Sequence, residues 1–213
     1  MTQAYTETAQ SSCAIHLVLK ADFKTWSASQ HAVVNTWLDQ SGFKADAGNF
    51  SLLPNEQGEL SAVILIIEDE HDVWQLGKLA LQVPVGNYQL NTNLSDNALK
   101  QAYLAWGMGA YQFTMYKKAK REASTLYLPP ALQADTLNAV LAASLVRDLI
   151  NTPAEDLNPV ALSRTMATLA AQFKADFSDV VGDDLLKQGY NAIHTVGRAA
   201  EKAPRLLDLT WGD

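Results

Sequence analysis

The side chains that could support acid–base or metal chemistry are spread thinly along this chain. Its four histidines stand far apart in the sequence: His16, His31, His71 and His194. None has the HExxH spacing or lies near a CxxC pair, the patterns in which neighbouring side chains hold zinc. No serine or cysteine nucleophile is paired with a histidine in a recognisable way. We therefore predict no catalytic, cofactor-binding or metal-binding residue in this chain.

Two acidic segments could in principle bind a cation or act as an acid–base pair. The EDEHD segment at residues 68–72 is five polar residues long, but one loop rarely completes a coordination sphere. Acids are also favourable at the start of the helix expected after it. Asp183 and Asp184 are adjacent, and adjacent side chains on a helix point apart. Both segments are therefore interpreted as acids that begin a helix.

Charge and cysteine content restrict the partners and the compartment. The chain has 16 Lys and Arg against 23 Asp and Glu, a net charge of −7, which argues against general affinity for nucleic acid. The one basic cluster lacks interleaved aromatic residues and is interpreted as a solvated turn: Lys117, Lys118, Lys120 and Arg121. A single cysteine, Cys13, in an apolar run indicates an inert thiol and a reducing compartment. With no transmembrane segment or signal peptide expected, the predicted location is cytoplasmic.

Strands and helices are expected to alternate up to residue 128, which indicates an α/β domain. Apolar runs predict strands at 13–19, 49–53, 61–67 and 88–90. The strand at 61–67 is continuously aliphatic, so it should be central and covered on both faces. Helices are predicted at 26–38, 73–81 and 95–106, the last capped by Ser95. Gly107 and Gly109 do not continue as GxGxxG and are expected to break that helix before a strand at 110–116.

Paired Pro129 and Pro130 predict a domain boundary, because regular structure cannot continue through them. The predicted domains are 1–128 and 129–213. Past the prolines we expect a long helix at 132–150 and a second helix, to 173, with Asn158 as its cap and Pro159 in its first turn. Strands at 177–181 and 205–210, with a short helix at 183–187 between them, should be neighbours joined by a right-handed crossover.

The order of phrases in the last third of the chain resembles one family closely. These phrases are RDLINTP at 147–153, NP at 158–159, GDDLL at 182–186, AIHTVGRA at 192–199 and APRLLDL at 203–209. They resemble the entry into the catalytic domain of the leucyl (cytosol) aminopeptidase family. GAYQF at 109–113 and LYLP at 126–129 are similar to the end of its amino-terminal domain. The resemblance implies an α/β fold with a macro-like mixed-sheet amino-terminal domain, a connecting helix and an incomplete α/β/α catalytic domain.

The resemblance also implies an activity for the parent protein. Family members are two-metal peptidases that remove N-terminal residues, and their metal ligands follow the point equivalent to residues 211–213. We therefore expect no cofactor in this chain and two divalent metals, zinc or manganese, in the complete enzyme, where they would activate water. Peptide substrates and a homo-oligomer, a hexamer in the family, are implied for the parent. The chain itself should be inactive, and Gly197 with Arg198 should have a structural role.

Two alternatives of other kinds stay open. The chain could be a non-catalytic module that binds DNA, as the amino-terminal domains of some family members do, or a small ligand, which the macro-like outline would allow. It could also be a regulatory or oligomerisation piece. Against DNA stands the net charge of −7, and against a macro-type nucleotide site stands the lack of a glycine-rich phosphate loop before a helix. The strand at 205–210 would expose apolar groups, so it should be poorly ordered or pack against another chain, by domain swapping or by edge pairing.

Overall fold

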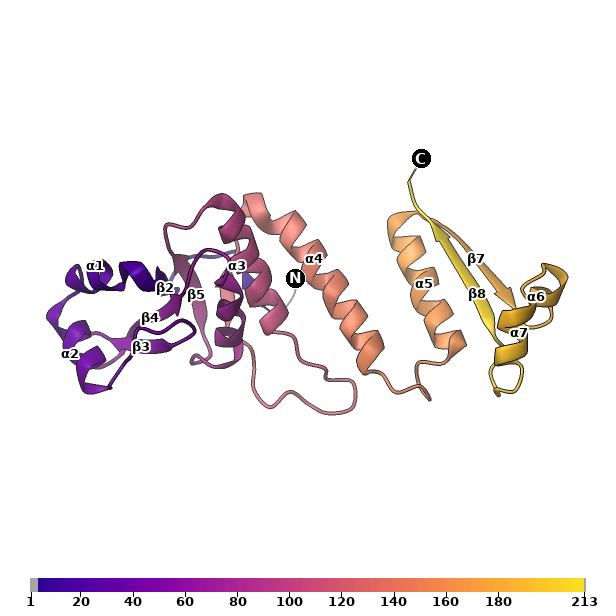
Figure 1. The fold of residues 1–213 in the computed structure, drawn as a ribbon, viewed down its shortest axis with the longest axis horizontal. Helices are drawn as coiled ribbons and strands as arrows, with labels where there is room; N and C mark the ends of the chain where they lie inside the picture. The colour runs from indigo at the N-terminus through magenta and orange to yellow at the C-terminus, as the bar shows by residue number, and fades with distance from the viewer. Residues whose placement is uncertain (1–3, 213) are drawn as a thin grey trace. The chain divides into compact units, whose positions relative to one another are not determined.

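The computed structural model describes residues 4–212, and the chain divides into two compact units, residues 1–147 and 148–213 (Figure 1). Strand β6 (Thr125–Tyr127) ends just before the paired prolines, and helix α4 (Pro130–Asn151) begins at the second of them. Proline suits a first helical turn because its missing N–H would have no partner there. The division between the units falls near the end of α4, and the predicted boundary at 128/129 stays a prediction.

A six-stranded mixed sheet forms the centre of the first unit, as expected for the α/β class. Its strand order is β1-β6-β5-β2-β4-β3, and all neighbours are parallel except β3 and β4. The strands not yet given are β1 (Tyr5–Thr6), β2 (Cys13–Leu19), β3 (Phe50–Pro54), β4 (Leu60–Ile67) and β5 (Asn87–Asn91). The predictions of strands at 13–19, 49–53, 61–67 and 88–90 are confirmed.

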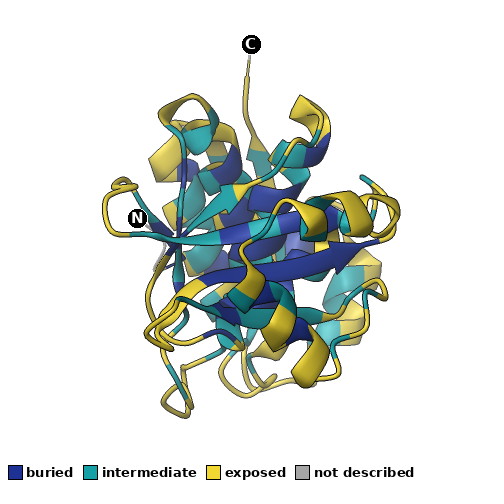
Figure 2. Ribbon diagram, turned by 90° about the vertical axis from the view of Figure 1, so that its left-hand side faces the viewer, coloured by how far each residue is buried: buried dark blue, intermediate teal, exposed yellow. Residues whose placement is uncertain are grey.

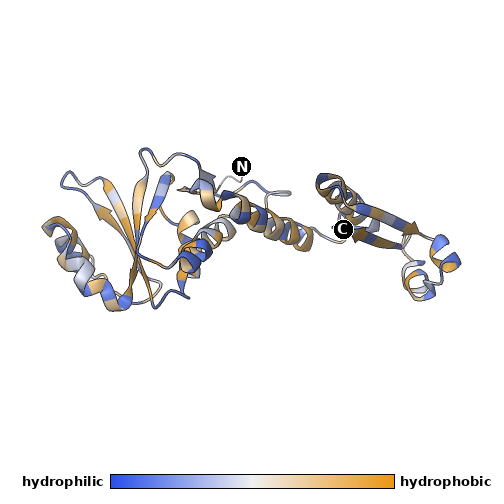
Figure 3. Ribbon diagram, turned by 90° about the horizontal axis from the view of Figure 1, so that it is seen from above, coloured by the Kyte–Doolittle hydropathy of each residue, from blue (hydrophilic) through white to orange (hydrophobic). Residues whose placement is uncertain are grey.

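Strand β4 is covered on both faces, as its continuous aliphatic sequence predicts. Alternate residues point to opposite faces of a strand, so β4 contributes to two cores. One core lies against the 3-10 helix η2 (Val73–Leu81) and α3 (Asp96–Gly109), and the other lies against α2 (Ala32–Gln40). The two sets are Val63, Leu65 and Ile67, and Ala62, Ile64 and Ile66. Figure 2 shows buried residues concentrated in the middle of the sheet, and Figure 3 shows hydrophobic segments along its strands.

The single helix predicted at 26–38 is wrong, because the structure has two helices there. A 3-10 turn η1 (Lys20–Asp22) leads into α1 (Phe23–Ala28), and α2 starts four residues later. Polar side chains between the helices bind backbone that a continuous helix would use. The Ser29 hydroxyl and the Gln30 amide both donate to the carbonyl oxygen of Trp26, at 2.7 and 3.1 Å. Such local hydrogen bonds compete with helical ones and end α1.

The helix break predicted at Gly107 and Gly109, and the strand at 110–116, are also wrong. Helix α3 runs through Gly109, and residues 110–116 form no strand. A Cβ atom on Gly109 would lie 2.0 Å from the carbonyl oxygen of Gly77 in η2, so the glycine permits close packing of the two helices. Packing outweighs the low helix propensity of glycine here. The loop after α3 is held by side chains: Gln112 donates to the Arg121 carbonyl at 3.0 Å.

The second unit packs helix α5 (Pro159–Phe173) on a two-stranded sheet of β7 (Asp176–Val181) and β8 (Arg205–Thr210). The strands are neighbours as predicted, but they are antiparallel, so the predicted crossover is wrong. Between them lie α6 (Asp184–Lys187) and α7 (Asn191–Gly197). The longer of these helices, α7, has seven residues and rises only about 10 Å, whereas a six-residue strand spans about 20 Å. It is therefore too short to carry the chain back along β7, as a parallel crossover requires. The backbone N–H of Gly182 donates to Pro204 at 2.9 Å and closes the connection at its base.

Candidate functional site

A hollow of about 410 Å³ lies in the first unit where three parallel strands end. Trp26 in α1 follows β2, Glu70 follows β4, and Asn91 ends β5. Carboxyl ends of neighbouring parallel strands lie at one edge of a sheet, so the sheet order β5-β2-β4 brings these residues together. No local sequence pattern pointed to this grouping.

Glu70 has a structural task at the rim of this hollow. Its two carboxylate oxygens accept from Ser95, one from the backbone N–H at 3.0 Å and one from the hydroxyl at 2.5 Å. Ser95 in turn caps α3, as predicted, by accepting from the N–H of Ala98. The Ser95 hydrogen bonds lower the pKa of Glu70. The carboxylate is therefore kept ionised and in place beside the hollow.

His16 forms part of the hollow's wall and contacts the indole ring of Trp26. The ring centroids are 5.5 Å apart and the rings are tilted by 60°. Partial burial lowers the pKa of His16, so its imidazole is neutral at neutral pH. The indole N–H of Trp26 is buried and has no hydrogen-bond partner among the described residues.

In the second unit, a partly buried polar network ties α5 to both strands. The Ser163 hydroxyl donates to Asp179 Oδ2 in β7 at 2.6 Å, and the Arg205 guanidinium in β8 donates to the same oxygen. Asp179 Oδ1 and Arg205 Nε are buried without a partner among the described residues. Sequence patterns did not predict this network, because its members lie on three separate elements.

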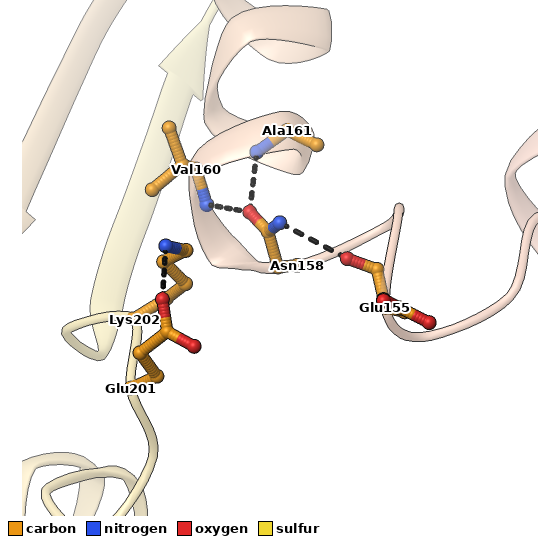
Figure 4. A network of polar contacts seen from close by, with 6 residues as sticks. All are labelled: Glu155, Asn158, Val160, Ala161, Glu201 and Lys202. Carbon is orange, nitrogen blue, oxygen red and sulfur yellow. Dashed lines mark hydrogen bonds and ion pairs between the residues drawn. The ribbon is translucent and has the colours of Figure 1, made fainter.

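An apolar hollow of about 850 Å³ also belongs to the second unit. Its lining includes Leu162 of α5, Val196 of α7 and Leu207 of β8, and Val196 is 86% exposed. The start of α5 lies beside it: the Asn158 side chain accepts from the N–H groups of Val160 and Ala161, at 3.1 and 3.2 Å (Figure 4). The predicted Asn158 cap and first-turn proline are confirmed.

The acidic segments are occupied by local contacts. The Asp69 carboxylate accepts from the N–H of His71 at 2.7 Å, as in a loop that turns on itself. Asp183 contacts His194 at 3.2 Å, whereas Asp184 pairs with Lys187 at 2.6 Å. The two aspartates thus have different partners, and they lie at the start of α6, where the sequence predicted acids that begin a helix.

The other residues singled out in the sequence have structural surroundings. Arg121 donates to the carbonyl oxygens of Leu81 and Val83, at 2.7 and 2.5 Å, so it clamps the end of η2. The three lysines of the basic cluster are exposed, and His31 is exposed at the start of α2. Burial raises the pKa of the Cys13 thiol, which disfavours its reactive thiolate. A Cβ atom on Gly197 would lie 2.4 Å from Pro204, so this glycine allows the chain to pass closely.

The metals implied by the family resemblance find no suitable donor set in this part of the chain. Residues 4–212 contain no group of three or more His, Cys, Asp or Glu side chains that could hold an ion. The polar network of the second unit supplies one carboxylate, that of Asp179, and its arginine and serine are not typical ligands for zinc or manganese. No helix of the described residues combines the length and the apolarity needed to cross a bilayer.

Comparison with known proteins identifies the class. The family model described as the M17 aminopeptidase N-terminal domain matches residues 13–129, and that of the cytosol aminopeptidase family catalytic domain matches residues 144–213. The chain is 34% identical to the cytosol aminopeptidase of Coxiella burnetii, with a TM-score of 0.91 over 99% of this chain and 46% of that enzyme. The chain belongs to the cytosol aminopeptidase (M17) family.

Two further solved structures share the fold at lower identity. The bottromycin maturation enzyme BotP in complex with Mn is 21% identical, with a TM-score of 0.73 over 94% of this chain and 45% of BotP. The leucyl aminopeptidase of Trypanosoma brucei in complex with bestatin is 19% identical, with a TM-score of 0.66 over 97% of this chain. The chain spans less than half the length of these relatives.

Proposed function

We propose that this chain is the amino-terminal domain and the first part of the catalytic domain of a metal-dependent leucyl aminopeptidase, which removes N-terminal residues from peptides. The observation that carries the proposal is the 34% identity to the Coxiella burnetii enzyme across 99% of the chain. The match of residues 144–213 to the catalytic-domain model supports it.

Residues 4–212 alone are proposed to be inactive. They hold no group of donors for a metal pair, so the zinc or manganese ions of a complete enzyme would depend on residues outside them. No step of peptide hydrolysis is therefore assigned to these residues. Their role in the second unit is structural: the contacts of Ser163 and Arg205 with Asp179 fix α5 on its sheet.

The apolar hollow of the second unit is proposed to receive the remaining part of the catalytic domain. Val196 is 86% exposed there, and the transfer of an aliphatic side chain from water into an apolar contact is favourable. The matched enzyme from Coxiella burnetii extends well beyond the 46% that corresponds to this chain. The proposed occupant of the hollow is therefore the rest of the catalytic domain, which accounts for this difference in length.

A chimera tests the proposal. Residues 1–213 would replace the corresponding segment of the Coxiella burnetii enzyme, and hydrolysis of leucine p-nitroanilide would be measured with added manganese. We expect metal-dependent turnover by the chimera and none by the 213-residue chain. A correctly folded chimera without turnover would contradict the assignment, as would hydrolysis by the chain alone.

One pair of variants tests the packing face. Val196→Asp in the chimera should abolish assembly of the active domain, because a charge would enter an apolar contact. Thr195→Asp, at an exposed neighbouring position in α7 outside the hollow's lining, is the matched control and should leave turnover unchanged.

The parent enzyme is further proposed to be cytoplasmic and homo-oligomeric, with a hexamer as the expected assembly, and its amino-terminal domain is proposed to be macro-like. Exposed apolar residues on α4 support association: Leu141, Val146 and Ile150. Light scattering of the chimera would measure its mass. A monomer at micromolar concentration would contradict the proposed assembly.

A further inference from the structure

The hollow of the first unit stands at a place where α/β sheets commonly bind ligands. From β2 the chain passes through α1, α2 and β3 to β4 on one side, and then through η2 to β5 on the other side of β2. The two connections contribute to cores on opposite faces of the sheet. Such a reversal of direction leaves a crevice outside the carboxyl ends of the central strands.

We propose that this hollow binds a small amino-bearing heterocycle without phosphate, of the nucleobase or nucleoside class, stacked on Trp26. The inference is independent of the proposed peptidase function. The volume of about 410 Å³ falls within the range of pockets that bind small organic ligands.

The charge of the hollow selects against anionic ligands. Asp22 and Glu70 bring two carboxylates to it, and its lining residues include neither lysine nor arginine. His16 adds no positive charge at neutral pH, because burial lowers its pKa. A phosphate would meet like charges here, whereas the exocyclic amino group of a base would meet hydrogen-bond acceptors.

The aromatic wall supplies a surface for a planar ligand. Trp26 and His16 both line the hollow, and no hydrogen bond to a described residue fixes the Trp26 ring. Indole rings stack on bases of any sequence because every base has a π-face. The Trp26 ring stacks on that of Phe23, with centroids 6.0 Å apart, which holds the indole as a fixed platform for a ligand.

Side-chain amides can read the edge of such a ligand. Asn91 and Asn93 line the hollow and are exposed, and each amide carries a carbonyl acceptor and two N–H donors. The hydroxyl of Thr92 is occupied, since it donates to the Leu17 carbonyl at 3.1 Å. An aminopurine or aminopyrimidine has adjacent donors and acceptors that such amides pair with.

Titration of the isotope-labelled 213-residue chain tests the proposal, with adenosine, AMP and putrescine as probes followed by amide NMR. Adenosine should shift the amides of residues 16–19 and 91–94 saturably. AMP should bind about fivefold more weakly, the effect of one like-charge contact in a partly solvated site. Putrescine, a cation without a ring, should not displace adenosine.

Two variants with matched controls locate the binding. Trp26→Ala should weaken adenosine binding about tenfold, whereas Trp74→Ala, at an exposed position in η2 outside the lining, should not change it. Asp22→Asn should reduce the difference in binding affinity between adenosine and AMP, and Asp39→Asn in α2 is its control. Since Asp22 is exposed, its variant should fold even if Trp26→Ala does not.

Each contrary result overturns the proposal. In the titrations, these results are no saturable shift with adenosine, AMP bound as tightly as adenosine, or displacement of adenosine by putrescine. In the variants, they are an adenosine affinity that Trp26→Ala leaves unchanged, or a ratio of adenosine to AMP affinity that Asp22→Asn leaves unchanged. Unshifted amides in β4 provide the check that each variant retains the fold.

Discussion

Gly109 should be required for the contact between α3 and η2, and Gly109→Ala tests this. A Cβ atom there would lie 2.0 Å from the carbonyl oxygen and 2.4 Å from the carbonyl carbon of Gly77. Both obstacles are backbone atoms, so no side-chain rotation relieves the clash and one helix must shift. Forced overpacking of a core costs about 1–3 kcal/mol, and the rigid obstacle places this case at the upper end.

The substitution to alanine also stabilises the helix, and this gain must be subtracted from the cost of overpacking. Alanine is favoured over glycine in a helix interior by about 1 kcal/mol, and Gly109 is the last residue of α3, where the gain is smaller. The net expected loss in the free energy of unfolding is about 2 kcal/mol. For a unit of this size, the melting temperature should fall by roughly 4–8 °C.

Urea and thermal unfolding followed by tryptophan fluorescence would measure the loss. The background variant Trp211→Phe removes the one tryptophan of the second unit, so the remaining signal reports on the first. Gly86→Ala is the control, since its Cβ would meet nothing closer than 3.8 Å, and it should change the stability by less than about 0.5 kcal/mol. A Gly109→Ala protein as stable as the parent would refute the reasoning.

Four further outcomes are expected. Asp179→Ala should lower the free energy of unfolding of the second unit by about 3 kcal/mol in urea, because it leaves the largely buried Arg205 charge unpaired; a loss under about 0.5 kcal/mol would contradict this. Asn158→Ala should cost about 1 kcal/mol in the same assay through its lost cap, and an unchanged urea midpoint would count against the cap. Burial lowers the pKa of His16 from 6.5, so the unfolded chain binds its proton more readily and stability should decline as the pH falls below that value. His16→Gln should flatten this decline between about pH 7.5 and 5.5 in urea midpoints, and an equally steep decline would argue against it. Random duplex DNA should not shift in a gel at about 150 mM salt, given the net charge of −7, and sub-micromolar binding would overturn this.

The sequence predicted the elements whose signals are local. The cap of α5 lies within four residues, from Asn158 to Ala161, and is recognisable without any tertiary contact. The unbroken aliphatic run of β4 required cover on both faces, since either face alone would leave large side chains in water. Family-like phrases in the last third added the rest of the architecture.

Some of the failures depend on contacts between distant segments. A glycine in a helical pattern can indicate either a helix break or the close approach of another segment. At Gly109 only the position of Gly77, 32 residues earlier in the chain, decides between the two. The hollow of the first unit collects Trp26, Glu70 and Asn91 through the order of strands in the sheet. No periodicity encodes that order, so its chemistry could not be found from residue spacing.

The pairing of β1 with β6 bears on how the chain folds as it is synthesised. Tyr5 lies opposite Leu126, about 120 residues later, and the Tyr5 hydroxyl donates to the Tyr103 carbonyl at 2.6 Å. At a translation rate of about 5–20 residues per second, the partner strand of β1 follows it by roughly 6–24 s. During that interval the amino-terminal segment has no strand to join, while β2, β4 and β5 can already pair. The ribosome therefore imposes an order in which β1 is made before β2, β4 and β5 but enters the sheet after them.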